Sequence, residues 1–234
     1  MIKVENIYKN YDSKVIMKDF NINFEKNKVS VLLGSSGCGK STLFNMLSSL
    51  DKEYRGKILI DGKVSYIFQE DRLIPWLTVE ENLSLISSQE KDINGVLEKF
   101  HVESKAKTLA RNLSGGEKQR VSIARAFYHG GEIILMDEAL RSLDMLLKLK
   151  IIEEISDNIS HESKTMVIIS HDIQEALLIG DRIFILDKDP MNIVESYDIN
   201  TPRKNRILKS GELLDLEKEI YQKLLGEKSK MLSE

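Results

Sequence analysis

A chain of 234 residues is long enough for one sizeable α/β domain with a lobe inserted in it. Hydrophobic residues make up 41% of it and charged residues 30%, an ordinary composition for a globular protein. A formal net charge of -3 argues against nucleic acid as the main partner. The single cysteine excludes an intrachain disulfide, and no apolar run approaches the ~18 residues that a membrane-spanning helix needs.

Apolar patterns predict the strands. Phe20, Ile22 and Phe24 alternate with other residues, which indicates a strand with one buried face. Residues 58–64 contain an Asp-Gly pair between apolar residues and predict two strands joined by a turn. Short, continuously apolar runs suit strands of a parallel sheet that helices cover on both faces. Three such runs and a fourth expected strand lie at 29–33, 133–136, 166–169 and 183–186.

Helices are expected to alternate with these strands. Thr78 with Glu81, and Ser114 with Glu117, have the spacing of a capping box, so helices should begin near residues 78 and 114. Apolar residues that recur on one face indicate two more helices. They are Leu43, Met46, Leu47 and Leu50 for one helix, and Leu146, Leu147, Ile151, Ile152 and Ile155 for the other. A terminal helix is expected over 212–225.

These elements predict an α/β fold formed by one domain over residues 1–234. Residues 1–69 and 114–200 would form its core, in which strands and helices alternate around a parallel sheet. Residues 70–113 show a helical pattern, and we expect a small helical lobe there. Residues 201–234 would be a C-terminal tail, whose basic stretch at 202–206 we interpret as a solvated loop.

A glycine-rich loop follows the predicted strand at 29–33. Residues 34–41 match G-x-x-x-x-G-K-[ST] and lead into an amphipathic helix, the context that a phosphate-binding loop requires. Lys40 would reach the β- and γ-phosphates, and the Ser41 hydroxyl would bind Mg²⁺. We interpret Cys38 as a position of this loop rather than a catalytic thiol. The expected nucleotide-binding residues here are Gly34, Ser35, Ser36, Gly37, Cys38, Gly39, Lys40, Ser41 and Thr42.

Two carboxylates end another buried run. Asp137 and Glu138 follow the apolar residues 133–136, so they would face the crevice where α/β sheets bind ligands. Asp137 is placed to hold Mg²⁺ through its water shell, and Glu138 is placed to polarise the attacking water. An acidic pair at a helix N-terminus is the alternative, but the phosphate loop upstream favours the catalytic interpretation.

A glycine pair beside a serine opens the helix near residue 114. Residues 113–120 read Leu-Ser-Gly-Gly-Glu-Lys-Gln-Arg, and here the chain resembles the ABC ATPases, whose diagnostic motif is LSGGQ or LSGGE. A capped helix alone would explain Ser114 and Glu117, but the whole run before an acidic strand is specific. The resemblance implies a P-loop NTPase core of the RecA type, with an N-terminal antiparallel β region, an inserted helical subdomain, and ATP with Mg²⁺ as ligands.

The same resemblance implies a second subunit. In the family, the residues equivalent to Ser114, Gly115, Gly116 and Glu117 close over the ATP that the phosphate loop of another chain holds. A helix N-terminus with bared amides suits a γ-phosphate. One copy of each motif therefore predicts a dimer, most simply a homodimer, with two composite sites.

Four more residues match positions of the family. Tyr11 would stack on adenine, although an ordinary strand aromatic is the alternative, and Gln69 would sense Mg²⁺ and the attacking water. Asp144 would cross the dimer interface, and His171 would contact the γ-phosphate. His101, His129 and His161 have no such context, and we take them as surface or hydrogen-bonded residues. The loop after Glu138 departs from the family, with Ala139 in place of the usual proline and Arg141 where many members have a small residue.

The segment after Gln69 indicates the kind of transporter. Residues 69–82 resemble the nitrate, sulfonate and taurine group of ABC importers, which also includes importers of vitamin precursors, and residues 201–203 fit that group. The resemblance implies a membrane permease that contacts the lobe at 70–113, a separate solute-binding protein, and a cytoplasmic position at the inner face of the cell membrane. The ring of Trp76 would pack in the core or contact a partner, and the sequence leaves both open.

Two other functions remain open. One is an ABC ATPase of an exporter or cell-division complex, against which the Pro-Trp after Gln69 argues mildly. The other is a soluble ABC ATPase in iron–sulfur assembly. The long coiled coils of repair proteins and the paired ABC domains of translation factors are both missing from the sequence.

Overall fold

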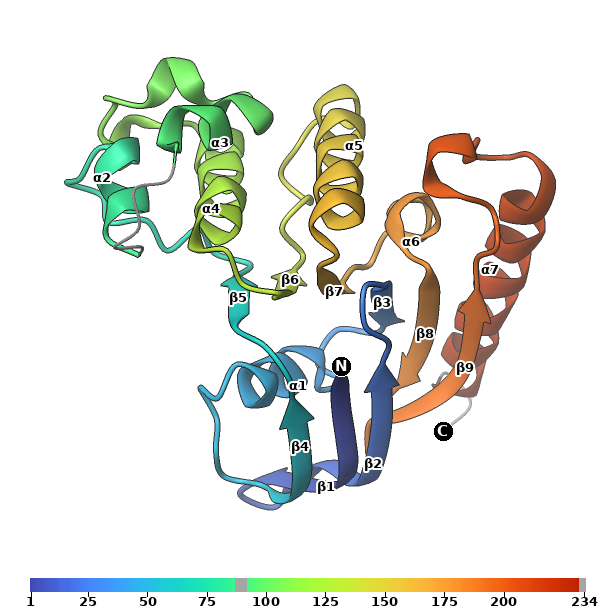
Figure 1. Ribbon diagram of the computed structural model, residues 1–234. Coiled ribbons are helices and arrows are strands. Elements are labelled where there is room, and N and C mark those ends of the chain that lie inside the picture. The colour runs from blue at the N-terminus through green and yellow to red at the C-terminus, as the bar shows by residue number, and fades with distance from the viewer. Residues whose placement is uncertain (87–91, 232–234) are drawn as a thin grey trace. The chain divides into compact units, whose positions relative to one another are not determined.

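The computed structural model describes residues 1–86 and 92–231, and the chain divides into two compact units (Figure 1). Unit 1 combines residues 1–61 with the chain from residue 165 onward, and unit 2 comprises residues 62–164. Each unit contains parallel strands and helices, so the predicted α/β fold is confirmed.

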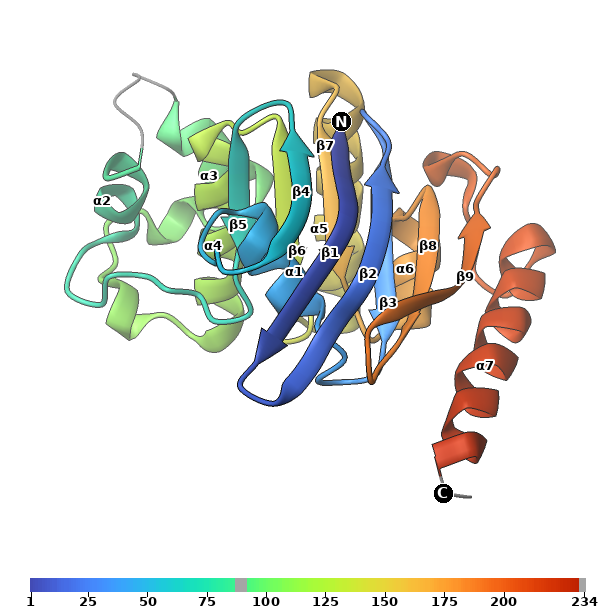
Figure 2. The same cartoon turned by 90° about the horizontal axis from the view of Figure 1, so that it is seen from below.

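An antiparallel sheet forms the first part of unit 1. Strand β1 (Ile2–Tyr11) lies between β2 (Lys14–Phe24) and β4 (Arg55–Ile60), in the order β2-β1-β4 (Figure 2). Apolar side chains that alternate along β1 and β2 are buried, as their period of two requires. They are Ile2, Val4, Ile7, Phe20, Ile22 and Phe24. The predicted half-buried strand and the antiparallel N-terminal region are confirmed.

Parallel strands form the second part of unit 1. Strand β3 (Val29–Gly34) pairs in parallel with β7 (Thr165–Ile169) on one side and β8 (Arg182–Asp187) on the other. Every residue of β3 and β7 is buried, which explains their continuously apolar sequences. Strand β9 (Asn192–Asp198) pairs antiparallel with β8. Its residues are partly exposed and form no continuous apolar run, so the sequence did not predict this strand.

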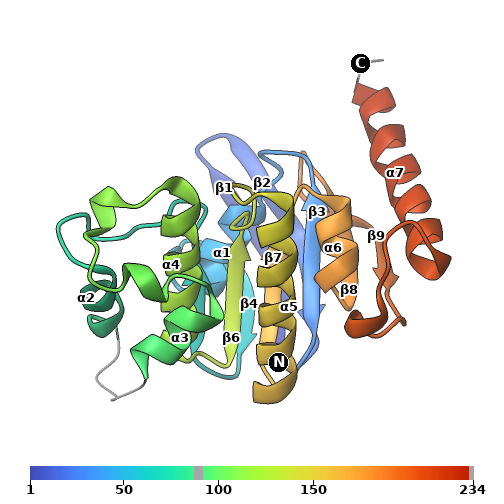
Figure 3. The same ribbon diagram turned by 90° about the horizontal axis from the view of Figure 1, so that it is seen from above.

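Three α-helices lie in the described part of unit 1. Helix α1 (Lys40–Leu47) follows the glycine-rich loop, α6 (Ile173–Ile179) packs against β3, and α7 (Gly211–Met231) packs against α6 and β8 (Figure 3). The predicted helices after Lys40 and near the C-terminus are confirmed. Leu50 was wrongly placed on the apolar face of α1, because the helix ends before it and its side chain is 61% exposed.

Unit 2 contains two parallel strands and its own helices. Strand β5 (Val64–Ile67) pairs with β6 (Ile133–Asp137), and the longer helices are α4 (Gly115–His129) and α5 (Met145–Glu162). The part of the helical lobe that the structure describes contains short elements only. They are α2 (Val79–Ser84), α3 (Ile93–Lys99), η1 (Glu103–Lys105) and η2 (Ala110–Asn112).

The two strands expected around the Asp-Gly pair at 61–62 exist but do not pair with each other. β4 pairs with β1, whereas β5 pairs with β6. An Asp-Gly pair predicts a chain reversal, but the pairing partners are chosen by the burial of each strand. The two predicted strands are therefore confirmed, but they belong to different sheets.

Both predicted capping boxes are present. Thr78 and Ser114 are the N-caps of α2 and α4, and each hydroxyl accepts a hydrogen bond from the amide three residues later. The side chains of Glu81 and Glu117 return to the amides of the capping residues at 2.7 and 2.8 Å. Two amides of each helix start are thereby satisfied.

The basic stretch at 202–206 is not the solvated loop that the sequence suggested. The Arg206 side chain is 1% exposed, and its guanidinium donates to the carbonyls of Leu177, Leu178 and Gly180 at the end of α6, at 3.0, 3.1 and 2.6 Å. Arg203, in the short helix η3 (Arg203–Asn205), donates to Ile179 and pairs with Asp181. A charge run in sequence does not reveal such partners, because the carbonyls belong to another element. Among the described residues, no helix is long and apolar enough to cross a membrane.

Glu212 fastens the start of α7. Its carboxylate accepts four hydrogen bonds, from the amides of Asn200 and Thr201 and from both side chains of that pair, at 2.6–3.1 Å. The Thr201 hydroxyl and the Asn200 amide are the largest causes that lower the pKa of Glu212 to about 2. Because the folded carboxyl has the lower pKa, its stabilisation is complete well above pH 4.5 and is lost as the pH falls towards 2.

We expect Glu212→Gln to lower the free energy of unfolding at pH 7 by about 1 kcal/mol, because the amide nitrogen cannot accept the Thr201 bonds. The difference from wild type should be smaller at pH 3, where the unfolded carboxyl is protonated. Urea unfolding followed by circular dichroism at both pH values measures this. Glu219→Gln, on the exposed side of the same helix, is the control. An equal difference at both pH values would contradict the assignment.

Candidate active site

The phosphate-loop motif lies between β3 and α1, as its sequence required. A Cβ atom on Gly34 would lie 2.5 Å from the carbonyl oxygen of Leu186, so the close approach of β8 admits only glycine. Gly39 has a φ of 110° and would meet Ile16 at 2.8 Å, so both its backbone and its surroundings exclude a side chain. The loop conformation therefore depends on its glycines.

Lys40 lies inside the loop with its ammonium group against backbone oxygens. Its residue is 5% exposed, and Nζ donates to the carbonyls of Gly34 and Ser35 at 2.9 Å each and to Cys38 Sγ at 3.7 Å. These acceptors are all uncharged, so they do not neutralise the positive charge of the ammonium group, which can attract an anion. Cys38 is buried, which agrees with a loop position rather than a reactive thiol.

The N-terminus of α1 is built differently from the other helix starts. Side-chain oxygens cap helices α2 to α6, whereas no side chain caps α1. Gly39 occupies the capping position, so the positive end of the helix dipole and its first amides are presented to the loop. Together with Lys40, this arrangement suits a phosphate group.

His171 lies beside the phosphate loop because of strand register. Leu32 of β3 pairs with Ile169 of β7, and the Ser170 amide donates to the Leu32 carbonyl at 3.3 Å. Gly34 and His171 therefore leave neighbouring parallel strands at the same edge. The structure brings His171 and the phosphate loop together within unit 1, and the His171 side chain is exposed there.

Tyr11 ends β1 with its ring held by two residues that the sequence did not suggest. The phenol donates to Asp51 Oδ2 at 3.0 Å, and the Lys9 ammonium lies 4.6 Å from the ring centroid. Lys9 is buried and pairs with Asp51 at 2.9 Å, so the three side chains form one cluster. No sequence signal links residues 42 positions apart. The ring is half exposed, so it remains available for stacking, which stays a prediction.

Unit 2 brings Gln69 and the two acids to one edge by the same geometry. Ile67 of β5 pairs with Met136 of β6, so Gln69, just beyond β5, and Asp137, the last residue of β6, lie at the same edge of neighbouring parallel strands. Asp137 is buried, and the Tyr66 hydroxyl donates to it at 3.5 Å. Burial first, and the Asp137 charge second, raise the pKa of Tyr66, which therefore stays a neutral donor. Tyr66 is a neighbour that sequence reasoning missed.

Glu138 occupies a conformation that few residues adopt. Its φ is 49°, in the left-handed region, and such strain concentrates at functional sites. Arg141 lies 3.5 Å from the Glu138 carboxylate. Helix α5 begins only at Met145, so the alternative of an acidic pair at a helix N-terminus was wrong for these two acids.

The signature residues lie at an exposed helix N-terminus. Ser114 and Gly115 are exposed, and nothing lies within 4 Å of a Cβ placed on Gly115. The Ser114 amide and then Lys105, 3.0 Å away, lower the pKa of Glu117 to about 2. Asp144 caps α5 by accepting from the Leu147 amide at 3.0 Å. Within this chain both motifs serve as caps, and their roles across a dimer remain predictions.

The structure also places Trp76 and His129, whose surroundings the sequence left open or only suggested. Trp76 is 70% exposed, so core packing was the wrong alternative, and contact with a partner stays a prediction. His129 Nδ1 lies 2.8 Å from Ser65 Oγ, which confirms it as a hydrogen-bonded residue.

The predicted site residues thus fall into two groups. Unit 1 holds Tyr11, the loop residues 34–42 and His171, whereas unit 2 holds Gln69, residues 114–117, the acids 137 and 138, and Asp144. In the described part of the chain, no group of three or more His, Cys, Asp or Glu could hold a metal ion alone. Mg²⁺ prefers oxygen ligands and is commonly bound by one or two carboxylates beside substrate phosphates. The hydroxyl of Ser41, the amide of Gln69 and the carboxylate of Asp137 each offer an oxygen of the kind that Mg²⁺ takes.

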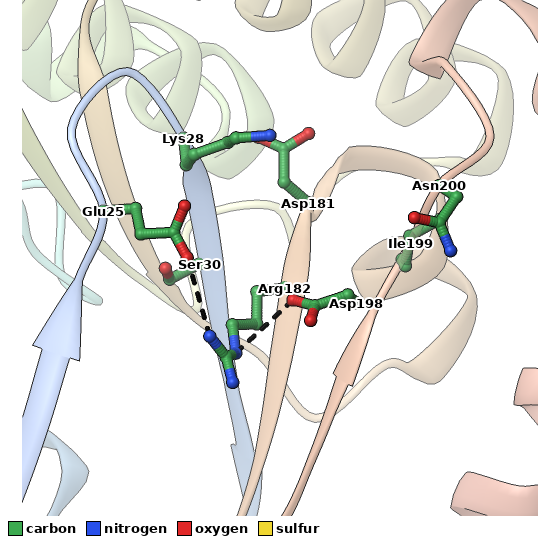
Figure 4. Close-up of a pocket in the computed structure, with 8 residues that line it drawn as sticks. All are labelled: Glu25, Lys28, Ser30, Asp181, Arg182, Asp198, Ile199 and Asn200. Carbon is green, nitrogen blue, oxygen red and sulfur yellow. Dashed lines mark ion pairs between the residues drawn. The ribbon is translucent and has the colours of Figure 1, made fainter.

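A pocket of about 240 Å³ lies elsewhere in unit 1 (Figure 4). Ser30 and Arg182, near the amino ends of β3 and β8, help to line it, whereas the phosphate loop follows the carboxyl end of β3. Arg182 pairs with Glu25 at 3.5 Å and with Asp198 at 3.4 Å. Asp181, which also lines the pocket, pairs with Arg203. The lining contains none of the predicted site residues.

Comparisons with known proteins agree with these motifs. The ABC transporter family matches residues 17–141. The aliphatic sulfonates import ATP-binding protein SsuB 2 of Pseudomonas syringae pv. tomato is 33% identical over 204 residues, which cover 85% of this chain and 88% of that protein. The aliphatic sulfonates import ATP-binding protein SsuB of Bacillus cereus is 37% identical over 201 residues, which cover 80% of this chain and 80% of that protein.

Solved structures give the same result. A bacterial ABC transporter cassette, solved as a dimer, has a TM-score of 0.78 and 29% identity, and the match covers 86% of this chain and all of that one. The same cassette in a post-hydrolysis state bound to ADP and Pi matches equally well.

Replacing Lys40 tests the phosphate loop. We expect Lys40→Ala to weaken binding of a nucleoside triphosphate at least tenfold, because it removes the cation between the loop carbonyls. Titration with a fluorescent nucleotide analogue measures this. Lys28→Ala, outside the loop, is the control. Equal affinity of the Lys40 variant and wild type would overturn the assignment.

Proposed function

This chain belongs to the ABC transporter family, and we propose that within it the chain binds and hydrolyses ATP to power a membrane importer. The observation that carries the proposal is the glycine-rich loop with Lys40 inside it, beside His171 and at an uncapped helix N-terminus. Relatives named as import ATP-binding proteins, similar over at least 80% of the chain, support the import direction.

Each site residue has a role that its surroundings support. Lys40 and the amides of the loop hold the β- and γ-phosphates, and Tyr11 stacks on adenine from its place beside Asp51. Glu138 polarises the attacking water, and His171 contacts the γ-phosphate. Phosphoryl transfer needs little covalent help from a protein, so these groups act by positioning and by charge.

Mg²⁺ is the metal that these oxygen donors fit. We assign Ser41, Gln69 and Asp137 to hold it together with the nucleotide phosphates. When bound there, Mg²⁺ would supply positive charge to offset that of the nucleotide phosphates. The Tyr66 hydroxyl keeps the Asp137 carboxylate oriented through its hydrogen bond.

The signature residues act on the nucleotide of a second subunit. Ser114 caps helix α4, and Ser114 and Gly115 are exposed at its N-terminus. The phosphate loop of this chain precedes a different helix, α1. Residues 114–117 and Asp144 then complete a composite site in a homodimer, and the similar cassette solved as a dimer supports this arrangement. ATP at such an interface stabilises the dimer through contacts that the monomer cannot make.

Removal of the water-polarising carboxylate tests the dimer. We expect Glu138→Gln to bind ATP and Mg²⁺, to hydrolyse it at least a hundredfold more slowly, and to elute as a dimer in size-exclusion chromatography. Glu153→Gln, an exposed acid of α5, should keep the wild-type rate and remain monomeric after hydrolysis. A Glu138→Gln variant that stays monomeric with ATP bound would contradict the composite site.

The helical subdomain at 70–113 is the surface that we assign to the permease. Trp76 and Leu85 lie in it at 70% and 61% exposed, and exposed large apolar side chains are typical of partner surfaces. The complex would also include a separate solute-binding protein, and the chain would lie at the cytoplasmic face of the membrane. Aliphatic sulfonates, for which the relatives are named, are the first solute class to test.

A membrane pulldown tests the importer. The wild-type chain should recover a polytopic permease from native membranes, and Trp76→Ala should recover much less while its ATPase rate in solution is unchanged. Tyr8→Ala, an exposed aromatic of β1, is the matched control. Recovery of ribosomes or of iron–sulfur assembly proteins in place of a permease would refute the transport role.

A further inference from the structure

The C-terminal segment, residues 201–224, is bound to both ends of helix α6. At the helix C-terminus, the buried Arg206 donates to three carbonyls and also to Thr201 at 2.9 Å. Cations and donors near a helix C-terminus satisfy its unpaired carbonyls and oppose the negative end of its dipole. The guanidinium therefore caps α6 from a segment more than 20 residues away.

A second bond joins the segment to the first turn of α6. Gln174 Nε2 donates to Glu217 Oε1 at 3.0 Å, and Glu217 is only 8% exposed. Leu213, Glu217 and Ile220 lie on one face of α7, and all three are buried. A carboxylate on an otherwise apolar face requires a partner, and Gln174 is that partner.

Gln174 is three residues after His171. Between them, the Asp172 carboxylate caps α6 by accepting from the amides of Gln174 and Glu175 at 3.0 and 3.2 Å. On the other side of His171, the Ser170 amide donates to Leu32 of β3 at 3.3 Å. The backbone of His171 is therefore fixed by β3 before it and by the first turn of α6 after it.

We infer that the C-terminal segment positions His171 for ATP hydrolysis, and that Gln174 and Glu217 are positioning residues that act through α6. This inference rests on the proposed ATPase function. With the Gln174–Glu217 bond intact, the first turn of α6 holds its place against α7, and His171 keeps its alignment with the phosphate loop. Phosphate binding itself depends on β3 and α1, which the segment does not touch through this bond.

The kinetic test replaces Glu217. We expect Glu217→Ala to lower kcat for ATP about tenfold with KM unchanged, because small misplacements of reacting groups cost rate. Glu217→Gln should restore most of the rate, since its amide oxygen can still accept from Gln174. Glu219→Ala is the matched control, with the same substitution two residues away on the exposed side of α7.

A mutant cycle and hydrogen exchange separate positioning from general stability. Gln174→Ala should match Glu217→Ala, and the double variant should lose no more than either single variant. Amide exchange should rise at residues 170–175 and stay unchanged in β1 and β2.

Wild-type kcat in Glu217→Ala would overturn the inference, as would a rate loss without faster exchange at 170–175. A rise in KM equal to the fall in kcat would overturn it too. A wild-type protein without ATPase activity would refute the proposed function instead, and the exchange experiment on α6 would still report whether α7 holds that turn.

Discussion

The parallel pairing of β3 with its two neighbours is the constraint on which unit 1 depends. β8 approaches β3 so closely that Gly34 has no room for a side chain, and the register with β7 sets Ser170 against Leu32. Parallel strands present their carboxyl ends at one edge of a sheet, where α/β proteins bind ligands. The phosphate loop and His171 therefore need no contact with each other to be aligned. In unit 2, β5 and β6 align Gln69 with Asp137 by the same means.

The sequence correctly predicted those features that depend on residues close together in the chain. Capping boxes at Thr78 and Ser114 and the continuously apolar runs of β3 and β6 were correct, because each is determined within a few residues. The glycine-rich loop was found for the same reason. Only the structure shows which atoms leave no room for a side chain at Gly34 and Gly39, but the motif already requires glycine at both positions.

The predictions from sequence failed where the structure of a segment depends on a partner far away in the chain. The solvated loop predicted at 202–206 was wrong because the acceptors of Arg206 are carbonyls of α6. The strands on either side of residues 61–62 were predicted, but their pairing partners, β1 and β6, were not. The Tyr11–Asp51 bond and the Tyr66–Asp137 bond span 40 and 71 positions. A single sequence contains no signal for such pairs, so these parts of the site could not be predicted.

The loop after Glu138 shows how a missing family residue is replaced. Ala139 stands where the family usually has proline, yet Ala139 and Leu140 are buried, and the Arg141 amide donates to the Glu138 carbonyl at 3.2 Å. The Arg141 side chain is 77% exposed, so its ion pair with Glu138 is screened by water and contributes little. Burial and the turn hydrogen bond, rather than a proline ring or a salt bridge, keep Glu138 in its strained conformation.

Helix α6 illustrates why the C-terminal segment matters to the site. A helix of seven residues is marginal by itself, because the cost of forming the first turn is spread over few hydrogen bonds. Its buried side chains pack against β3 and α7. At its ends, Asp172 satisfies the first amides, Arg206 satisfies the last carbonyls, and Gln174 joins the first turn to Glu217. Two of these three supports depend on residues beyond position 200. A change in that segment can therefore reach His171, two residues after β7, without altering the sheet.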